Sequence, residues 1–440
     1  MLETSIKKSN AGKRILLTVL LTLLFVHCLG TFSVKLMNIS SADGYRIDFI
    51  AYYTAAKLIE EGETEEIYVG VEDDFSVVTS GKYFETAKRA GFPYAPTRFL
   101  YLPLFATPFR LLTTFDFPTA ANIWFAINLM CILAIIYLEW YLTKEFFPPV
   151  PGLIVIILLN LYSFPLLYGL TLGQTSILIY LIICFIFYCT VKSYDVSAGV
   201  SLGVITALKF SPLLFVLYFL YRKKYKVLIY CMFTLAGISF LSLIMYGLPL
   251  HKLYLRYLMR LSNMSIAGWS NQSIEAILLR LFTDNTLVYF YPVKAPPVLI
   301  FIRYTVTILL IGAVYLCGRG TNNVNLHQRY PLEFSSVALC MLIMPSISWL
   351  HYFNVATLSV ILISAYCFTT YSARGLIIIF IVLMSYVLIA YHPDYTALVN
   401  CYGQGILIKA AASFPFIGAS IMLLIQLALL KDKRCRSQKL

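Results

Sequence analysis

The segment Ile47-Asp48-Phe49-Ile50-Ala51-Tyr52-Tyr53-Thr54-Ala55-Ala56 follows the first long apolar run, where a chain that has crossed a membrane would emerge into water. At helical spacing, Asp48 and Tyr52 lie one turn apart and share a face. Asp48 would lie near the start of that helix, where the macrodipole favours its charged form. An ionised carboxylate held at a membrane surface has the properties of a general base. The alternative is a helix cap followed by ordinary interfacial tyrosines.

The composition indicates an integral membrane protein with many spans. Of 440 residues, 60% are hydrophobic and 12% are charged, whereas soluble domains carry roughly 25% charged residues. The mean hydropathy is +0.79. The apolar runs are continuous rather than alternating, which favours helices over a β-barrel. We therefore expect an all-α polytopic membrane protein that forms a single integral membrane domain over residues 1–440.

The net charge of +13 does not require a nucleic-acid partner, because most basic clusters lie beside or between apolar runs, as the positive-inside rule describes. Basic residues before the first run and after the last one place both the N-terminus and the C-terminus in the cytoplasm. Most of the ten cysteines lie inside apolar runs and are expected to be small buried hydrophobes. No CxxC or histidine-rich spacing indicates a structural metal.

Runs of spanning length predict roughly 12 transmembrane helices, from about Ile15–Leu36 to about Gly405–Leu430. The run from Val196 to Tyr221 has cytoplasmic flanks on both sides. Lys209 and Pro212 inside it predict two short helices with a hinge between them, lining a polar cavity.

Two long polar segments face outward in this topology. Residues 37–118 form a first outer loop with short interfacial helices, about 48–61 and 75–90, and a proline-containing interfacial or re-entrant piece over Phe99–Leu112. Residues 249–297 form a second outer loop. This loop is basic although it is outside. Its cations meet either lipid headgroups or an anionic phosphate group.

The unusual polar residues gather on the outer side: Asp48, Gln174, Lys209, Asn271, Gln272 and His351. An intramembrane lysine is the strongest single signal, because a charge there is costly and usually functional. A lone loop histidine is more often structural. Together these groups suit a phosphate-linked substrate, since cations hold a leaving phosphate and a carboxylate deprotonates an acceptor hydroxyl.

Several short motifs, in this order, resemble the bacterial polyprenol-phosphate-mannose-dependent mannosyltransferases, which have the GT-C glycosyltransferase fold. They are Asp48-Phe49-x-x-Tyr52-Tyr53-x-Ala55-Ala56, Phe92-x-Tyr94-x-Pro96, Gly173-Gln174-Thr175-Ser176, Lys209-x-x-Pro212, and Asn271-Gln272-Ser273 with Arg280. The resemblance extends to about residue 282 and is weaker after it. The charged stretch between Gly62 and Phe92 departs from the family pattern, so the resemblance does not identify the acceptor.

The resemblance implies an inverting transfer of a sugar, by family default mannose, from a polyprenyl-phosphate donor to a glycolipid or glycan acceptor. The reaction would occur on the outer face of a bacterial inner (cytoplasmic) membrane. Asp48 matches the catalytic aspartate of the family. The expected substrate-binding residues are Tyr52, Tyr94, Gln174, Lys209, Asn271, Gln272, Arg280 and His351. No cofactor or metal is expected, because cationic side chains can replace a metal.

Two other functions fit parts of the pattern. A transporter or flippase for a lipid-linked or anionic solute would use similar spans and an intramembrane lysine. It should show gates on both faces, whereas the informative polar residues here lie on the outer side. A scaffold subunit without chemistry is the third alternative.

Overall fold

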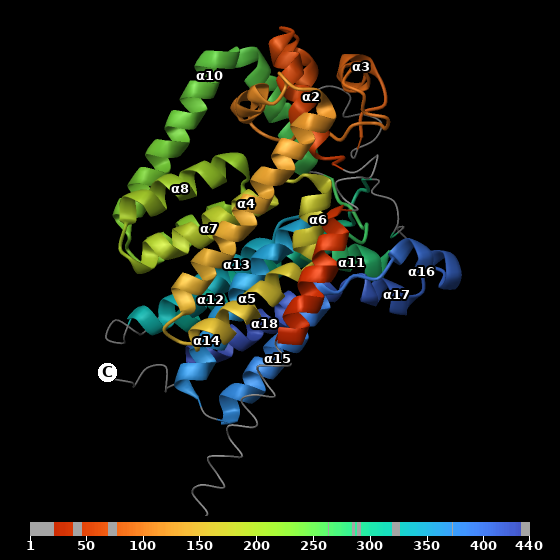
Figure 1. Ribbon diagram of the computed structural model, residues 1–440. Helices are drawn as coiled ribbons and strands as arrows, with labels where there is room; N and C mark the ends of the chain where they lie inside the picture. The colour runs from red at the N-terminus through yellow and green to blue at the C-terminus, as the bar shows by residue number, and fades with distance from the viewer. Residues whose placement is uncertain are drawn as a thin grey trace, which may run out of the picture.

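The computed structural model of the chain describes residues 22–37, 46–68, 77–262, 264–283, 287, 292–318, 326–371 and 373–432, and within these ranges it is helical, without strands (Figure 1). A first helix covers Thr22–Met37. The following helices, in chain order, are α2 (Phe49–Glu60), η1 (Thr64–Tyr68), α3 (Gly81–Arg89), η2 (Pro103–Leu111), α4 (Phe117–Thr143), α5 (Pro149–Leu161), α6 (Phe164–Leu172), α7 (Ser176–Val191), α8 (Asp195–Leu208), η3 (Ser211–Leu213), α9 (Leu214–Tyr221), α10 (Tyr225–Ser262), α11 (Ile274–Phe282), α12 (Pro297–Gly318), α13 (Leu326–Ile343), η4 (Leu350–Val355), α14 (Ala356–Thr370), α15 (Ala373–Ala390), α16 (Tyr395–Tyr402), α17 (Ile406–Ala411) and α18 (Phe414–Lys431).

Six of the described helices are long and apolar enough to cross a membrane: α4, α10, α12, η4 with α14, α15 and α18. The number rises to seven if α5 and α6, bent by 54° at their junction, form one broken span. Several shorter apolar helices, among them α7 and α8, pack inside the bundle. The prediction of an all-helical multi-pass membrane protein is therefore confirmed. Twelve spans and cytoplasmic termini stay predictions.

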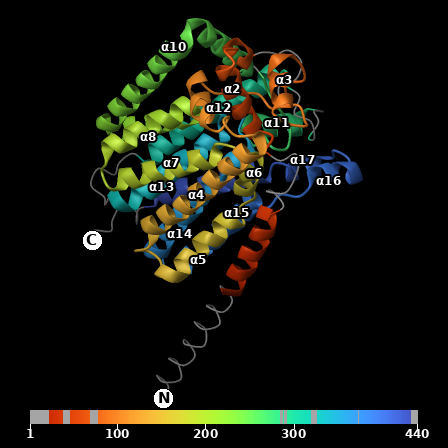
Figure 2. The same cartoon turned by 45° about the horizontal axis from the view of Figure 1, so that its top comes forward.

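The segment predicted to be the first outer loop forms a small helical layer at one end of the bundle (Figures 1 and 2). The helix predicted over 48–61 is α2, and the one predicted over 75–90 is the shorter α3. The proline-containing stretch predicted as interfacial contains the 3-10 helix η2, which packs against α2. Pro108 inside η2 lacks the amide hydrogen that a continuous helix needs, which explains why this apolar stretch does not form a long span.

The predicted hinge inside residues 196–221 is confirmed. Helix α8 ends at Leu208, and Lys209 has an extended backbone with φ −150° and ψ 139°. The chain resumes at Ser211, and Pro212 stands in the first turn of η3. Proline fits at the start of a helix because its missing amide hydrogen is not needed there. The hinge therefore leaves Lys209 between two helices rather than on the side of one.

Helices α8 and α10 pack closely through Gly199 and Gly203, which stand four residues apart on one face of α8. A Cβ atom at Gly203 would lie 2.6 Å from the Cβ of Thr234 and 2.8 Å from the Cys231 carbonyl oxygen. Small residues at this spacing let helix backbones approach each other in a membrane, where packing replaces the hydrophobic effect. This contact fixes α8, and hence the Lys209 hinge, against the part of α10 that precedes its kink at Gly247.

Substitution Gly203→Leu is expected to disrupt this contact, because a branched side chain has no space beside Thr234 and Cys231. Overpacking of this kind costs about 1–3 kcal/mol or more. The midpoint of thermal unfolding in detergent should fall, together with the yield of monodisperse protein. Gly237→Leu on α10 is the matched control, since a Cβ at Gly237 meets no atom within 4 Å. Equal stability of the two variants would contradict this packing.

Candidate active site

Asp48 stands at the N-cap of α2, but its side chain does not cap the helix. Instead, Gln174 Nε2 donates a hydrogen bond to Asp48 Oδ2 at 2.6 Å. Tyr52, one turn along α2, donates its hydroxyl to Gln174 Oε1 at 3.0 Å. The Tyr52 hydroxyl also lies 2.9 Å from the Tyr101 hydroxyl. The pair Asp48 and Tyr52, predicted to share a face, is thus joined through the Gln174 amide.

The contact between α2 and α6 brings Asp48 to Gln174. The backbone amide of Asp48 donates to the carbonyl of Leu172 at 3.1 Å, at the end of α6. Gly173 follows with φ +70°, and a Cβ there would lie 2.7 Å from the Cβ of Phe49. Only glycine meets both the left-handed backbone and this close approach without strain. The chain then turns so that the next residue, Gln174, faces the carboxylate.

These residues line a cleft at the end of the bundle that carries α2. Its walls come from segments far apart in the sequence, and they combine aromatic rings with polar groups: Ile47, Asp48, Ala51, Tyr52, Thr97, Arg98, Leu100, Tyr101, Tyr168, Leu172, Gln174, Ser270, Trp349 and His351. Four of the residues expected from the sequence are therefore together in one cleft. They are Asp48, Tyr52, Gln174 and His351.

His351 is buried, with 3% of its surface exposed, yet it lines the cleft. Neither ring nitrogen has a hydrogen-bond partner within the described part of the chain. A buried polar group without a hydrogen-bond partner lowers the stability of the folded protein. A histidine that only supports a loop would normally be hydrogen-bonded. The unpaired ring of His351 in the cleft lining therefore favours a role in binding a ligand.

Lys209 does not line the cleft but lies behind one wall. Its Nζ stands 2.8 Å from the ring centroid of Tyr352, the residue after His351. Its charge also acts electrostatically on His351. In the described ranges this ammonium takes part in no salt bridge. Burial without a carboxylate partner disfavours the charged form of a lysine. An anion bound beside Lys209 would supply the missing counter-charge and favour the ammonium.

Asn271, Gln272 and Arg280 do not line the cleft and are buried in the protein instead. The Asn271 amide bonds the Ile266 carbonyl at 2.9 Å and accepts from the Ser348 amide at 2.8 Å. The Gln272 amide donates to the Trp269 and Ala412 carbonyls. All three predicted residues are 0–1% exposed.

The Arg280 guanidinium, like the side-chain amides of Asn271 and Gln272, is bonded to backbone carbonyl oxygens. It donates to the carbonyl oxygens of Ala267, Gly268 and Asn271 and to the Ser413 hydroxyl. These bonds hold residues 267–280 to the start of α18. Arg280, with Asn271 and Gln272, is therefore placed to brace the cleft wall that carries Ser270 and Trp349, rather than to line the cleft.

Tyr94 stays apart from the cleft. Its side chain is 52% exposed and packs edge-on against Phe92. Arg98, four residues further on, does line the cleft and was missed from the sequence, as were Tyr101, Tyr168, Ser270 and Trp349. The prolines and aromatic residues around Arg98 mark a loop, but nothing in their spacing predicts that it returns to Asp48.

Burial raises the pKa of Asp48 to about 6, and hydrogen bonds from Gln174 and Thr97 partly oppose this shift. The pKa is therefore raised, whereas the position at the start of a helix was expected to favour the charged form. At pH 7 a carboxyl group with this pKa is still about 90% ionised. It is also a stronger base than an ordinary aspartate, because the best general bases have a pKa near the working pH.

The pH dependence of turnover follows from this pKa. If ionised Asp48 is the base, kcat/KM should be constant above pH 7 and fall about tenfold per pH unit below about pH 6, because protonation removes the base. Initial rates between pH 4.5 and 8.5 would measure this profile. Asp116→Gln, an exposed acid at the N-cap of α4, is the control and should keep the same profile. A profile that stays flat down to pH 4.5 would exclude an aspartate of this pKa as the base.

The chain is thus a helical membrane protein with a cleft at one end of the bundle, and this cleft contains a carboxylate, that of Asp48. The sequence model of glycosyltransferase family 87 matches residues 99–350, more than half of the chain. The protein therefore belongs to glycosyltransferase family 87, a family of GT-C-like membrane glycosyltransferases. No curated protein matches the chain significantly.

Proposed function

We propose that the protein is an inverting glycosyltransferase that moves a sugar, mannose by resemblance, from a polyprenyl-phosphate donor to an acceptor hydroxyl on the outer face of the inner membrane. Family membership supports glycosyl transfer. The observation that carries the proposal is a partly buried carboxylate with a pKa of about 6, held by Gln174 in a cleft that also contains an unpaired histidine. A transporter would not need a base held in this way.

The proposed reaction is a single displacement. Asp48 takes the proton of the acceptor hydroxyl as its oxygen attacks the anomeric carbon. The bond between that carbon and the phosphate oxygen breaks on the opposite face of the sugar, so the configuration inverts and the electron pair leaves with the phosphate. Gln174 keeps the carboxylate aimed at the acceptor.

The leaving phosphate needs positive charge and hydrogen-bond donors, because charge develops on it in the transition state. His351, on η4, can supply a ring N–H from the cleft wall, and Lys209 can supply positive charge from behind Tyr352. Arg98 adds a cationic side chain on the cleft wall itself. The rings of Tyr101, Tyr168 and Trp349 offer apolar faces of the kind against which the C–H face of a sugar can pack.

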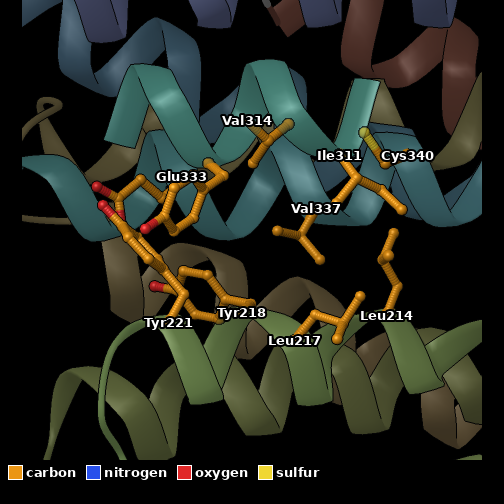
Figure 3. A pocket seen from close by; sticks show the side chains of 10 residues that line it. Leu214, Leu217, Tyr218, Tyr221, Ile311, Val314, Glu333, Val337 and Cys340 are labelled. Atoms are coloured by element: carbon orange, nitrogen blue, oxygen red, sulfur yellow. The ribbon is translucent and has the colours of Figure 1, made fainter. Parts of the chain in front are cut away.

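A second cavity supports a lipid-linked donor. It is a groove between α9, α12 and α13, lined by Leu214, Leu217, Tyr218, Tyr221, Ile311, Val314, Tyr315, Glu333, Val337 and Cys340 (Figure 3). Leu217 and Tyr315 are 48% and 45% exposed, so the groove opens towards the outside of the bundle. Its one carboxylate, Glu333, is neutralised by an ion pair with Arg222.

The groove begins close in sequence to the proposed phosphate site. Helix α9 starts at Leu214, five residues after Lys209. A lipid phosphate at Lys209 could therefore extend its apolar chain along α9 and into the groove, where the walls match hydrocarbon rather than water. This arrangement favours a polyprenyl donor over a water-soluble nucleotide sugar.

A groove-filling variant tests this part of the proposal. Val314→Trp should raise the KM for a donor with a long polyprenyl chain and leave a short-chain, water-soluble analogue unchanged. Leu309→Trp is the matched control, since Leu309 lies on the same helix, is 65% exposed and does not line the groove. Equal effects of Val314→Trp on long-chain and short-chain donors would remove the groove from the donor site.

A further inference from the structure

We propose that the hairpin of α16 and α17 lies in the outer leaflet of the membrane and inserts its tip among the lipids. This inference is independent of the donor and of the chemistry at Asp48. Residues 391–413 connect α15 with α18, which are both helices of spanning length and apolarity. The hairpin therefore starts and ends where two spans leave the bilayer.

The hairpin lies at the same end of the bundle as the cleft. Its last residues, Ala412 and Ser413, accept hydrogen bonds from Gln272 and Arg280 of the loop that also carries Ser270. In both views α16 and α17 project sideways from the bundle rather than along it (Figures 1 and 2). A segment that leaves the bundle sideways at the end of its spans runs along the membrane surface.

The two faces of the hairpin differ. One face packs inward, where Tyr395 and Ala412 are buried in a small core with Leu287. The tip exposes large apolar side chains instead: Tyr402 is 75% exposed, Ile406 61% and Leu407 80%. Gly403, with φ +72°, forms the turn between them. Such a cluster is costly in water and favourable at the boundary between headgroups and acyl chains.

The low charge of the hairpin and the apolar surface beside it indicate that lipid covers the tip. Residues 395–412 contain one charged side chain, Lys409, and its ammonium donates to the Thr283 carbonyl at 2.9 Å, against the protein. The adjoining span α15 also exposes an apolar surface, with Leu376, Ile377, Phe380 and Val387 each at least half exposed. The tip therefore continues a surface that already faces hydrocarbon.

Insertion of the tip into the lipid would hold the outer loops at a fixed distance from the membrane surface. The Gln404 side chain accepts from the Leu287 amide at 3.0 Å, and Gln272 bonds both Ala412 and Phe416. The hairpin, the second outer loop and the start of α18 thus form one braced unit. Through Ser270, that unit also forms part of the cleft wall.

The test uses an environment-sensitive dye at Leu407→Cys in full-length protein reconstituted into vesicles, with Cys401 and Cys435 replaced by serine. In the described ranges Cys401 is the exposed cysteine and the others are buried. The control is Glu85→Cys on α3, an exposed position on a polar helix. Each labelled protein is exposed to nitroxide-bearing phospholipids and, separately, to aqueous iodide.

We expect the lipid nitroxide to lower the emission at position 407 at least about twofold while iodide has little effect, because interfacial helices bury their apolar face about 5–10 Å into the leaflet. The dye at position 85 should show the reverse. Quenching of position 407 by iodide and not by lipid nitroxide would overturn the proposal. A second result would also overturn it: protection of position 407 from both quenchers that is lost when the protein is diluted among lipids. Such a result would mean that a second copy of the protein covers the tip.

Discussion

Replacement of Asp48 by asparagine is expected to lower kcat by about a hundredfold or more, the scale of a positioned general base. Asparagine keeps the size of the side chain but cannot accept the proton of the acceptor hydroxyl. It can still bond Gln174 after rotation of either amide, so the cleft should keep its shape. Donor KM should therefore change far less than kcat. Single-turnover transfer of labelled sugar would separate the chemical step from donor binding.

The control for this variant is Asp116→Asn, which removes an exposed carboxylate close to the same loop layer. Its turnover should stay near that of the wild type. Thermal unfolding of all three proteins should show that Asp48→Asn is folded. A folded Asp48→Asn variant that keeps wild-type turnover would show that Asp48 is not the base.

Removal of the Lys209 charge is the second change with a large expected effect. Lys209→Gln should lower kcat/KM for the donor by about 10- to 100-fold, because a charge-assisted hydrogen bond is worth about 1.5–3 kcal/mol and 1.4 kcal/mol is a factor of ten. Lys209→Arg should recover part of this loss by restoring the cation. Steady-state kinetics at varied donor concentration would measure both.

Stability distinguishes this role from a structural one. No salt bridge of Lys209 is lost in Lys209→Gln within the described ranges, so the unfolding midpoint should fall little or not at all. Lys57→Gln, on the surface of α2 and paired with Glu60, is the matched control and should leave donor kinetics unchanged. An unchanged donor kcat/KM in Lys209→Gln would place the leaving phosphate elsewhere.

Sequence reasoning located the centre of the cleft because its chemistry is concentrated in short motifs. Asp48 and Tyr52 stand at helical spacing, and Gln174 follows a glycine that allows a sharp turn. The break at Lys209 was predictable for a physical reason, since a lysine and a proline are both unfavourable inside a continuous span.

Other parts of the cleft were beyond sequence reasoning. Arg98 and Trp349 reach the cleft only because η2 packs against α2 and because the Asn271 amide bonds the backbone of the segment before Trp349. Conversely, Gln272 and Arg280 looked like ligand-binding residues. In sequence, a buried amide or guanidinium that holds carbonyl oxygens cannot be distinguished from one that faces a substrate.

The most direct test of the central claim measures sugar transfer by the purified, reconstituted protein. The donor is polyprenyl-phosphate-mannose with a radiolabel in the mannose. A bacterial membrane glycolipid extract would serve as acceptor, with a labelled nucleotide sugar as the alternative donor. The proposed function predicts label in the acceptor from the lipid donor, with inverted anomeric configuration, and none from the nucleotide sugar. Transfer from the nucleotide sugar alone, or movement of the lipid donor across the vesicle membrane without covalent transfer, would contradict it.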